Sequence, residues 1–231
     1  MKLSIGISVI VSVYNEEKTI KNIILSLLNI SIVDEIIIVN DGSIDKTSYI
    51  LENLGGKYDI KIISNIINRG KGYAMYRGVK IAKEELIVFI DAGINNLKSE
   101  HIESLALPII NGEADMVLGQ PSETMINKKI NPFKPLTGQR SLKKRDILPV
   151  LKKMKNSRFG VETLLNIHFA ANNKKIKNIF LHGLGHPTKF HKTSFFSASR
   201  EFVNAGREIL VTIFNNSNLI VKLSKNKLRH Q

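Results

Sequence analysis

The chain lacks several residue types that would define its chemistry. Among its 231 residues there is no cysteine, which excludes disulfide bonds, thiolate metal sites and a cysteine nucleophile. Aromatic residues make up only 6% of the chain, and no strand-like stretch alternates aromatic with basic residues, as surfaces that bind single-stranded nucleic acid do. We therefore expect no nucleic-acid partner, although the chain is basic.

Long apolar stretches are absent as well. No run approaches the roughly 18–20 apolar residues that a membrane-spanning helix needs. Residues 1–6 carry one lysine and lead into a strand-like run, without the pattern of a secretory signal. We expect a cytoplasmic protein, with the inner face of the membrane as the alternative location.

The familiar phosphate-binding loops are missing too. Neither G-x-x-x-x-G-K-[ST] nor G-x-G-x-x-G follows the first strand-like run, residues 5–13. This argues against ATP hydrolysis, NAD chemistry and nucleotidyl transfer. The run Gly70-Lys71-Gly72 opens a helical pattern, whose first amides can support an anion, but it is a weak signal by itself.

Acidic residues are scarce in one half of the chain. Residues 1–115 hold 12 basic and 15 acidic side chains, whereas residues 116–231 hold 22 basic and 5 acidic ones. The formal net charge of +14 therefore comes from the second half. This asymmetry predicts that the second half faces an anionic substrate or surface.

Hydrophobic patterning predicts an α/β fold. Short β-branched runs alternate with stretches of about ten residues whose apolar positions have helical spacing, which indicates βαβ units and a parallel sheet flanked by helices. The predicted strands are residues 5–13, 35–39, 60–64, 86–90 and 114–118. The predicted helices are residues 16–29, 45–54, 72–82 and 100–110.

The pattern changes after Gly119. Residues 121–137 contain three prolines and little periodicity, which predicts a loop over a site. Farther along, the chain is predicted to form two helices, a strand and a terminal amphipathic helix. Their ranges are residues 142–154, 160–171, 175–181 and 195–214. We expect one continuous domain with two halves, residues 1–120 and 121–231.

Four polar clusters follow predicted strands. The carboxyl ends of parallel strands share one edge of a sheet, where ligands bind. One such cluster is as readily a turn or a helix cap, but four at one edge predict a ligand site. The clusters are Tyr14-Asn15-Glu16-Glu17, Asn40-Asp41-Gly42-Ser43, Asn68-Arg69-Gly70-Lys71-Gly72 and Asp91-Ala92-Gly93.

These clusters, in this order and spacing, resemble the family 2 glycosyltransferases of GT-A fold, whose sheet is Rossmann-like. The similarity also includes Val13 and Phe89-Ile90, and it covers about residues 5–120. The later part is similar to the glucosyl-3-phosphoglycerate synthase and mannosylglycerate synthase type. That similarity rests on Thr137-Gly138-Gln139-Arg140, on Phe159-Gly160-Val161-Glu162, and on His186 followed by Lys189.

The resemblance implies a hexosyltransferase that uses a UDP-sugar or a GDP-sugar. It assigns residues 1–120 to the donor and residues 121–231 to the acceptor. By this resemblance Asp41 accepts a hydrogen bond from the base, Lys71 lies near the base or phosphates, and Asp91 begins the D-x-D element used for ribose and metal. The implied donor-binding residues are Val13, Tyr14, Asn15, Glu16, Asp41, Lys71, Asp91 and Ala92.

The resemblance also implies catalytic and metal-binding residues. Asp91, Arg140 and Glu162 are the implied catalytic residues, and Asp91 with His186 would hold Mg²⁺ or Mn²⁺. Without the resemblance, Glu162 is explained by the favourable dipole at a helix start, and His186 by packing in a turn. The implied substrate-binding residues are Thr137, Gly138, Gln139, Arg140, Glu162 and Lys189.

One residue departs from the family pattern. Gly93 stands where the family usually has a second Asp, which is normally the direct metal ligand. Asp91 and His186 alone are a thin shell for a cation that prefers oxygen ligands. Three interpretations stay open: a weak metal site completed by substrate, metal-independent transfer with basic residues in the metal's place, or a catalytically impaired nucleotide-sugar-binding protein.

Two kinds of acceptor stay open. One is a small phosphorylated or carboxylated metabolite, bound by Arg140 and basic neighbours. The other is a lipid phosphate or cell-envelope polymer, with residues 195–231 docked on anionic lipid; packing of this segment on the body or on a second subunit of a homodimer is the alternative. The subgroup resemblance implies transfer with retention of anomeric configuration.

Overall fold

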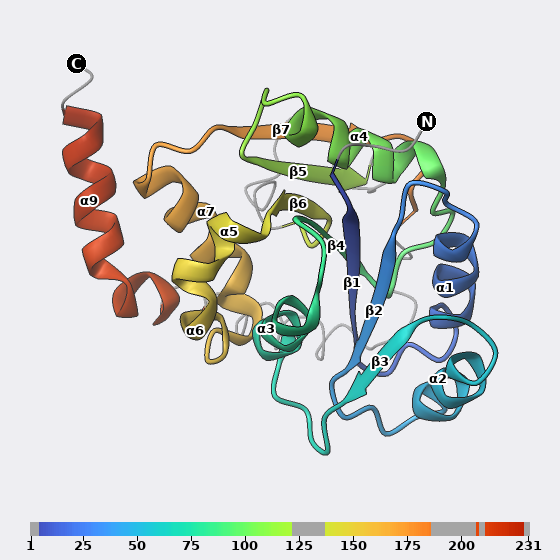
Figure 1. The fold of residues 1–231 in the computed structure, drawn as a ribbon. Helices are drawn as coiled ribbons and strands as arrows, with labels where there is room; N and C mark the ends of the chain where they lie inside the picture. Colours follow the sequence, from blue (N-terminus) through green and yellow to red (C-terminus); the bar gives the residue numbers. More distant parts are fainter. Residues whose placement is uncertain (1–4, 122–136, 186–206, 208–210, 229–231) are drawn as a thin grey trace.

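The computed structural model describes residues 5–121, 137–185, 207 and 211–228, which form a seven-stranded sheet between helices (Figure 1). The first elements are β1 (Ile7–Val13), α1 (Ile20–Leu28), β2 (Glu35–Asn40), α2 (Thr47–Gly55), β3 (Lys61–Ser64), α3 (Lys71–Ile81), β4 (Leu86–Asp91) and α4 (Ser99–Ile110). Next come β5 (Met116–Pro121), β6 (Arg140–Lys143), α5 (Lys144–Ile147), η1 (Leu148–Val150), α6 (Leu151–Met154), η2 (Arg158–Gly160), α7 (Val161–Ala171), β7 (Ile176–Leu181) and α9 (Ser217–Leu228). The predicted α/β fold with a mostly parallel sheet is confirmed.

The strands lie in the order β3-β2-β1-β4-β6-β5-β7. All neighbouring pairs are parallel except those of β6, which runs antiparallel between β4 and β5. Val13 of β1 lies opposite Asn40, and Ser12 lies opposite Asp91. The carboxyl ends of β1, β2 and β4 therefore meet at one edge. Because β6 is reversed, its first residue, Arg140, begins near that edge opposite Phe89.

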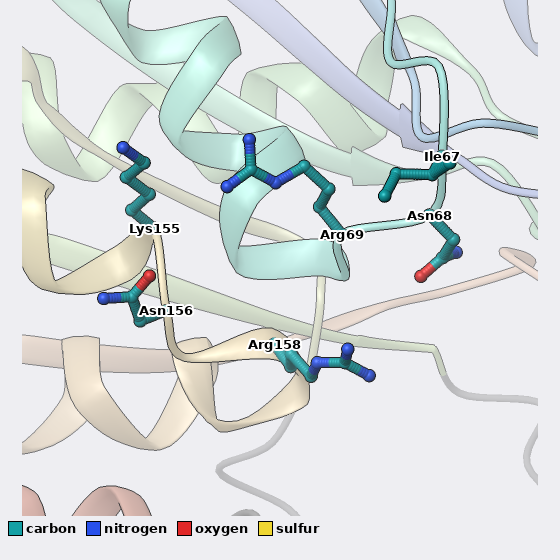
Figure 2. A pocket seen from close by; sticks show the side chains of 6 residues that line it. All are labelled: Ile67, Asn68, Arg69, Lys155, Asn156 and Arg158. Carbon is teal, nitrogen blue, oxygen red and sulfur yellow. The ribbon is translucent and has the colours of Figure 1, made fainter.

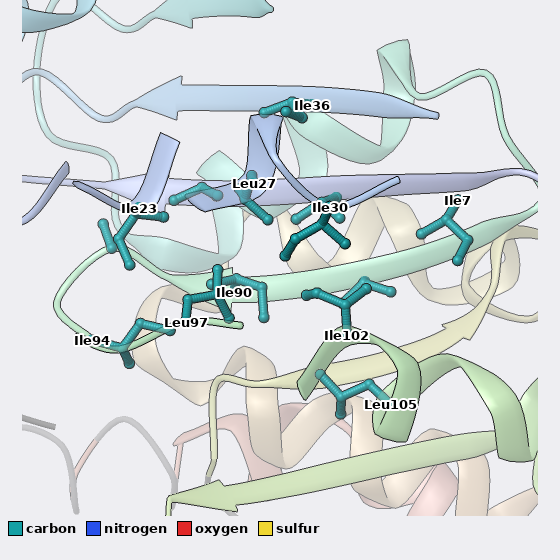
Figure 3. Packing of buried hydrophobic residues seen from close by; sticks show 14 of the residues in the cluster. Ile7, Ile23, Leu27, Ile30, Ile36, Ile90, Ile94, Leu97, Ile102 and Leu105 are labelled. Carbon is teal, nitrogen blue, oxygen red and sulfur yellow. The ribbon is translucent and has the colours of Figure 1, made fainter. Parts of the chain in front are cut away.

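Helices bury both faces of the sheet. Every residue of β2 is buried, which is typical of a strand covered on both sides. One face packs against α1, α2 and α4, with Ile23 and Ile102 among the buried side chains (Figure 3). The other face packs against α3, α6 and α7, where Met75 and Phe169 are buried. Each such side chain contributes about 1.5–3 kcal/mol by leaving water.

The prediction of a helix over residues 142–154 is wrong at its start. Residues 140–143 form β6, in which Ser141 and Leu142 are both fully buried between neighbouring strands. The helical remainder is divided into α5, η1 and α6. Pro149 lies in η1 and has no N–H to donate, so a regular α-helical ladder cannot run through it.

Other predicted boundaries shift by a few residues. The helix predicted from residue 16 begins at Ile20, because residues 16–19 form a turn in which Thr19 N donates to Glu16 O at 3.1 Å. The strand predicted at 114–118 runs from Met116 to Pro121. The predicted division into residues 1–120 and 121–231 stays a prediction, but strands from both sides of it share one sheet.

The C-terminal part is described only in pieces. Most of the predicted amphipathic helix at 195–214 and of the predicted loop at 121–137 lies outside the described residues. Helix α9 packs on α7, and Lys222 Nζ donates to Asn172 Oδ1 at 2.8 Å. None of the helices in the described ranges combines the length and apolarity that crossing a bilayer requires.

Candidate active site

The residues predicted to bind the donor gather at the carboxyl edge of the sheet. Tyr14, Asn15 and Glu16 follow β1, Asp41 follows β2, and Asp91 is the last residue of β4. The parallel register places these three strand ends side by side. Tyr14 exposes 43% of its surface, so a ring is available there for a ligand to pack against.

The loops after β1 and β2 are tied to each other. Asn15 N donates to Ser43 Oγ at 3.0 Å, and Ile44 N donates to Asn15 Oδ1 at 2.9 Å. Glu16 N donates to Thr47 Oγ1 at 2.9 Å. Asn15 has φ 54°, a left-handed conformation that asparagine tolerates better than most residues. These bonds fix the backbone of the Tyr14-Asn15-Glu16 cluster before any ligand arrives.

The carboxylate of Asp41 is hydrogen-bonded to other residues of the chain. The residue is only 3% exposed. Its carboxylate accepts hydrogen bonds from Asn65 Nδ2 at 2.6 Å, Arg69 N at 3.0 Å and Gly70 N at 2.7 Å. It thereby holds the loop before α3, where Gly70 has φ 91° and caps the helix. The predicted contact between Asp41 and the base stays a prediction.

Lys71 joins two carboxylates from different elements. It is the first residue of α3, and its Nζ lies 2.6 Å from Asp91 Oδ1 of β4 and 2.7 Å from Glu162 Oε1 of α7. Burial lowers the pKa of Lys71, but Asp91 and Glu162 raise it more, so its pKa lies above the ordinary value and the ammonium stays charged. This group of three is the electrostatic centre of the site.

The segment before β6 reaches the same centre. Gln139 Nε2 donates to Asp91 Oδ2 at 3.2 Å, and Thr137 Oγ1 donates to Gly119 O at 2.5 Å. A Cβ on Gly138 would overlap the carboxylate of Asp91, so only glycine allows this close approach. The structure therefore brings the predicted substrate-binding segment against the predicted donor-binding Asp91.

Arg140 is the largest fully buried side chain in the described structure. Its Nη2 donates to Thr137 O at 2.6 Å, and its Nη1 lies 3.4 Å from both Glu162 O and Asn166 Oδ1. Its Nε has no partner among the residues described. Burial lowers the pKa of Arg140, and Glu162 and Asp91 partly offset that effect. As placed, Arg140 holds the site together; its predicted acceptor contact stays a prediction.

The described residues do not fit a divalent metal. The oxygens of Asp91 contact Lys71 and Gln139, and Gly93 offers no carboxylate. Nowhere in the described ranges do three His, Cys, Asp or Glu side chains group in a way that would hold a metal ion. His186 and Lys189 lie outside those ranges. The backbone of Gly185, just before His186, pairs with Asn95 at N···O distances of 3.0 and 3.2 Å.

Two predicted donor residues contribute no exposed side chain. Val13 is 2% exposed and Ala92 is 3% exposed, and both pack in the core beneath the edge. Both residues therefore offer a ligand almost no accessible surface. The backbone oxygen of Val13 already accepts a hydrogen bond from Asp41 N at 2.8 Å.

A basic pocket beside the site was not predicted. It has a volume of about 310 Å³ and lies between the loop before α3 and the turn after α6 (Figure 2). Arg69 stacks over the Tyr73 ring at 3.7 Å, and Arg158 has φ 40°. A sequence signal existed in the basic run around residues 152–158. The lining residues are Ile67, Asn68, Arg69, Lys155, Asn156 and Arg158.

A mostly parallel α/β sheet with such a cluster at its carboxyl edge agrees with the GT-A fold of glycosyltransferases, which similar solved structures share. The chain belongs to glycosyl transferase family 2, because residues 8–179 match the sequence model of that family. The family and fold expected from the polar clusters are thereby confirmed.

Curated relatives are similar over shorter stretches. The chain is 38% identical over 88 residues to poly-beta-1,6-N-acetyl-D-glucosamine synthase of Staphylococcus epidermidis, which is 38% of this chain and 21% of that protein. It is 28% identical over 119 residues to 4,4'-diaponeurosporenoate glycosyltransferase of Staphylococcus aureus, which is 50% of this chain and 32% of that protein. The matches thus span a third or less of either relative.

Solved structures are similar over most of the chain. One is glucosyl-3-phosphoglycerate synthase from Mycobacterium tuberculosis with Mn²⁺, UDP and phosphoglyceric acid, at a TM-score of 0.72 and 20% identity, covering 92% of this chain and 78% of that one. The same enzyme with Mn²⁺, UDP-glucose and phosphoglyceric acid gives a TM-score of 0.71 at 20% identity, with coverages of 92% and 79%. At this identity the likeness shows the fold.

Proposed function

We propose that the chain transfers a sugar from a nucleoside-diphosphate sugar to an oxygen atom of an anionic acceptor. The observation that carries this proposal is the contact of Lys71 with both Asp91 and Glu162 at the carboxyl edge of a family 2 fold. Because α3, β4 and α7 each contribute one of these residues, the centre exists only in the folded chain. Such a preorganised group of charges suits a reaction in which charge develops on a leaving group.

The proposed donor is a UDP-sugar, with a GDP-sugar as the alternative. Similar solved structures contain UDP or UDP-glucose, which supports uracil as the base. Tyr14 offers an exposed ring near the ends of β1 and β2. Asp41, which follows β2, holds the loop that carries Arg69 and Gly70. We propose that the base and ribose bind between these two loops.

In the proposed reaction the bond between sugar C1 and the β-phosphate oxygen breaks, and its electron pair stays on the nucleoside diphosphate. The acceptor oxygen forms the new bond to C1, and its proton passes to the released β-phosphate oxygen of the nucleoside diphosphate. Lys71 and the first amides of α3 are proposed to stabilise the charge gained by the diphosphate. Glu162 is proposed to bind the transferred sugar. No step is routed through a divalent cation, because the described residues do not assemble a site for one.

The proposed acceptor is a small phosphorylated or carboxylated metabolite. Residues 116–231 carry 22 basic and 5 acidic side chains, and similar solved structures contain phosphoglyceric acid. We propose that the acceptor binds next to the segment 137–140, in which Gln139 and Arg140 are buried, and that Lys189 contacts it. Retention of anomeric configuration is proposed from the resemblance to that enzyme type, and the anomeric proton signal of the product tests it.

A second candidate is transfer to a lipid-linked or cell-envelope acceptor. It is favoured by the names of the curated relatives, a poly-beta-1,6-N-acetyl-D-glucosamine synthase and a 4,4'-diaponeurosporenoate glycosyltransferase. Membrane contact through residues 195–231, a homodimer and a cytoplasmic location stay predictions. Flotation of the full chain with anionic liposomes, compared with a chain ending at residue 194, separates this candidate from the first.

A thermal-shift panel of UDP-, GDP- and other nucleotide sugars tests the donor. The correct donor binds the folded chain and therefore raises its melting temperature. At a donor concentration 100 times its Kd, the free energy of unfolding rises by about 2.7 kcal/mol. Release of the nucleoside diphosphate in the presence of phosphorylated acceptors then tests transfer. If no nucleotide sugar shifts the melt, the proposal fails; binding without turnover across the acceptor panel identifies an impaired binding protein instead.

A further inference from the structure

We infer that Lys71 is the built-in cation of the diphosphate site, so that this chain binds its nucleoside diphosphate without a divalent metal. The inference rests on the proposed function, because it concerns the same site. It departs from the similar solved structures, which contain Mn²⁺ or Mg²⁺ together with UDP.

The first argument is the position of the charge. Lys71 Nζ lies 2.6 Å from Asp91 Oδ1 and 2.7 Å from Glu162 Oε1. Asp91 begins the D-x-D element, so the ammonium group stands at the first carboxylate of the element that the family pattern uses for ribose and metal. Two positive charges do not share such a place, since at 4 Å they repel by about 4 kcal/mol near a protein surface. A metal would therefore have to displace Lys71 first.

The second argument is the missing ligand. Position 93, where the family usually has the second carboxylate, is Gly93. Asp91 Oδ2 lies 3.2 Å from Gln139 Nε2, so both oxygens of Asp91 contact donors of the chain itself. Mg²⁺ and Mn²⁺ are selected by oxygen ligands. In the described part of the site, Asp91 is surrounded by hydrogen-bond donors rather than by further oxygen ligands.

The third argument is the capacity of Lys71 for one more partner. An ammonium group has three N–H donors, and the two carboxylates take two of them. The Lys71 side chain is 19% exposed, so it is not completely enclosed by the protein. Lys71 is also the first residue of the eleven-residue helix α3, where backbone amides and the helix dipole favour an anion. A β-phosphate oxygen fits both features.

The wild-type chain gives the first test. UDP and GDP are titrated by calorimetry in a buffer with EDTA and again in a buffer with MnCl₂. We expect the Kd of the preferred nucleotide to differ less than about threefold between the two buffers. A Kd at least about tenfold weaker in EDTA, equal to 1.4 kcal/mol, overturns the inference while leaving the proposed function intact. If neither nucleotide binds in either buffer, the proposed function itself fails.

Substitution of Lys71 gives the second test. In Lys71→Met the two carboxylates lose their common cation, and we expect UDP affinity in EDTA to fall at least about tenfold. Because Asp91 and Glu162 are then unmasked, Mn²⁺ should restore part of the affinity in this variant. Unchanged UDP affinity in a folded Lys71→Met chain overturns the inference. The EDTA comparison on the wild type decides the question if the variant does not fold.

A matched control exists at the opposite edge of the sheet. Lys61 at the start of β3 is also ion-paired, with Glu35 at the start of β2. Lys61→Met should lower the melting temperature without changing the Kd for UDP or its response to EDTA. A change in Kd equal to that of Lys71→Met would show that loss of any buried ion pair weakens binding, and would overturn the specific role of Lys71.

Discussion

The carboxylate of Glu16 lies beside the backbone of Gly93: a Cβ on residue 93 would stand 3.0 Å from Glu16 Oε1. The space into which a side chain at position 93 would project is therefore bordered by an acidic group from the loop after β1. Glu16 Oε2 also accepts a hydrogen bond from Thr19 Oγ1 at 3.0 Å, which orients it.

Gly93→Asp should create a cation requirement. The new carboxylate would lie close to that of Glu16, and two like charges at about 4 Å repel by roughly 1 kcal/mol in water. We expect a lower melting temperature in EDTA and a rise on adding MnCl₂ that the wild type does not show. Differential scanning fluorimetry measures both. Gly93→Asn is the matched control, since it adds the same volume without the charge and should not respond to Mn²⁺.

Gly138→Ala should damage the site and the fold together. The added Cβ would overlap the carboxylate of Asp91, so either the 137–139 segment or Asp91 must move. Overpacking of this kind costs about 1–3 kcal/mol, measured by urea unfolding. Gly56→Ala is the control, because there a Cβ meets only Glu52 O at 3.8 Å and φ is −75°. Equal stability of the two variants would contradict the close approach at Gly138.

Asp41→Ala should free the loop before α3. Asn65 Nδ2, Arg69 N and Gly70 N all lose their acceptor. Of these only the Gly70 N bond is fully buried, and a buried donor left unpaired costs about 1–3 kcal/mol. We expect a loss of a few kcal/mol in urea unfolding and faster hydrogen exchange at Arg69 and Gly70. Asp41→Asn keeps one acceptor oxygen and should lose less. Wild-type exchange rates in Asp41→Ala would show that the carboxylate does not hold the loop.

Glu35 should make stability depend on pH. Burial raises its pKa, but hydrogen bonds from Lys61, Ser8 and Lys83 N outweigh this, so its folded pKa lies below the ordinary value. Its contribution is therefore fully present above the unfolded pKa of about 4.3 and is lost as pH falls through the folded pKa.

The corresponding measurement is urea unfolding of Glu35→Gln across pH. At pH 7 we expect a loss of about 1–2 kcal/mol, because the hydrogen bonds to the ionised Glu35 are lost while Lys61, 37% exposed, is rehydrated. This loss should shrink steadily below about pH 4.3. Glu52→Gln, at an exposed position on α2, should change stability little at any pH. If the loss of stability in Glu35→Gln did not change with pH, Glu35 would not be ionised in the folded chain as assigned.

The first half of the fold could be predicted because its strands are short apolar runs and its helices have clear periodicity. β1, β2 and β4 lie where these runs are, and the polar residues after them meet at one edge as the parallel register requires. The strand β6 could not be predicted, since four residues between a loop and a basic helix show no alternation. Its identity depends on pairing with β4 and β5.

The sequence indicated which residues gather at the carboxyl edge of the sheet, but it did not indicate the contacts that they make with one another. Asp41 was expected to face the base, yet its carboxylate accepts from Asn65, Arg69 and Gly70. Nothing in the sequence indicates that Lys71 and Glu162, 91 positions apart, form an ion pair. Such contacts depend on how α3 and α7 pack against each other, and local sequence patterns do not predict that packing.

The described residues on either side of 122–136 are held together by hydrogen bonds. Gly119 of β5 receives a hydrogen bond from Thr137 Oγ1 and donates one from its N to Gln139 O at 2.9 Å. None of residues 122–136 takes part in this clamp, so exchanging them for those of a relative should leave the clamp in place. The chain therefore offers a position at which sequence can be exchanged while the sheet and the Lys71 centre are kept.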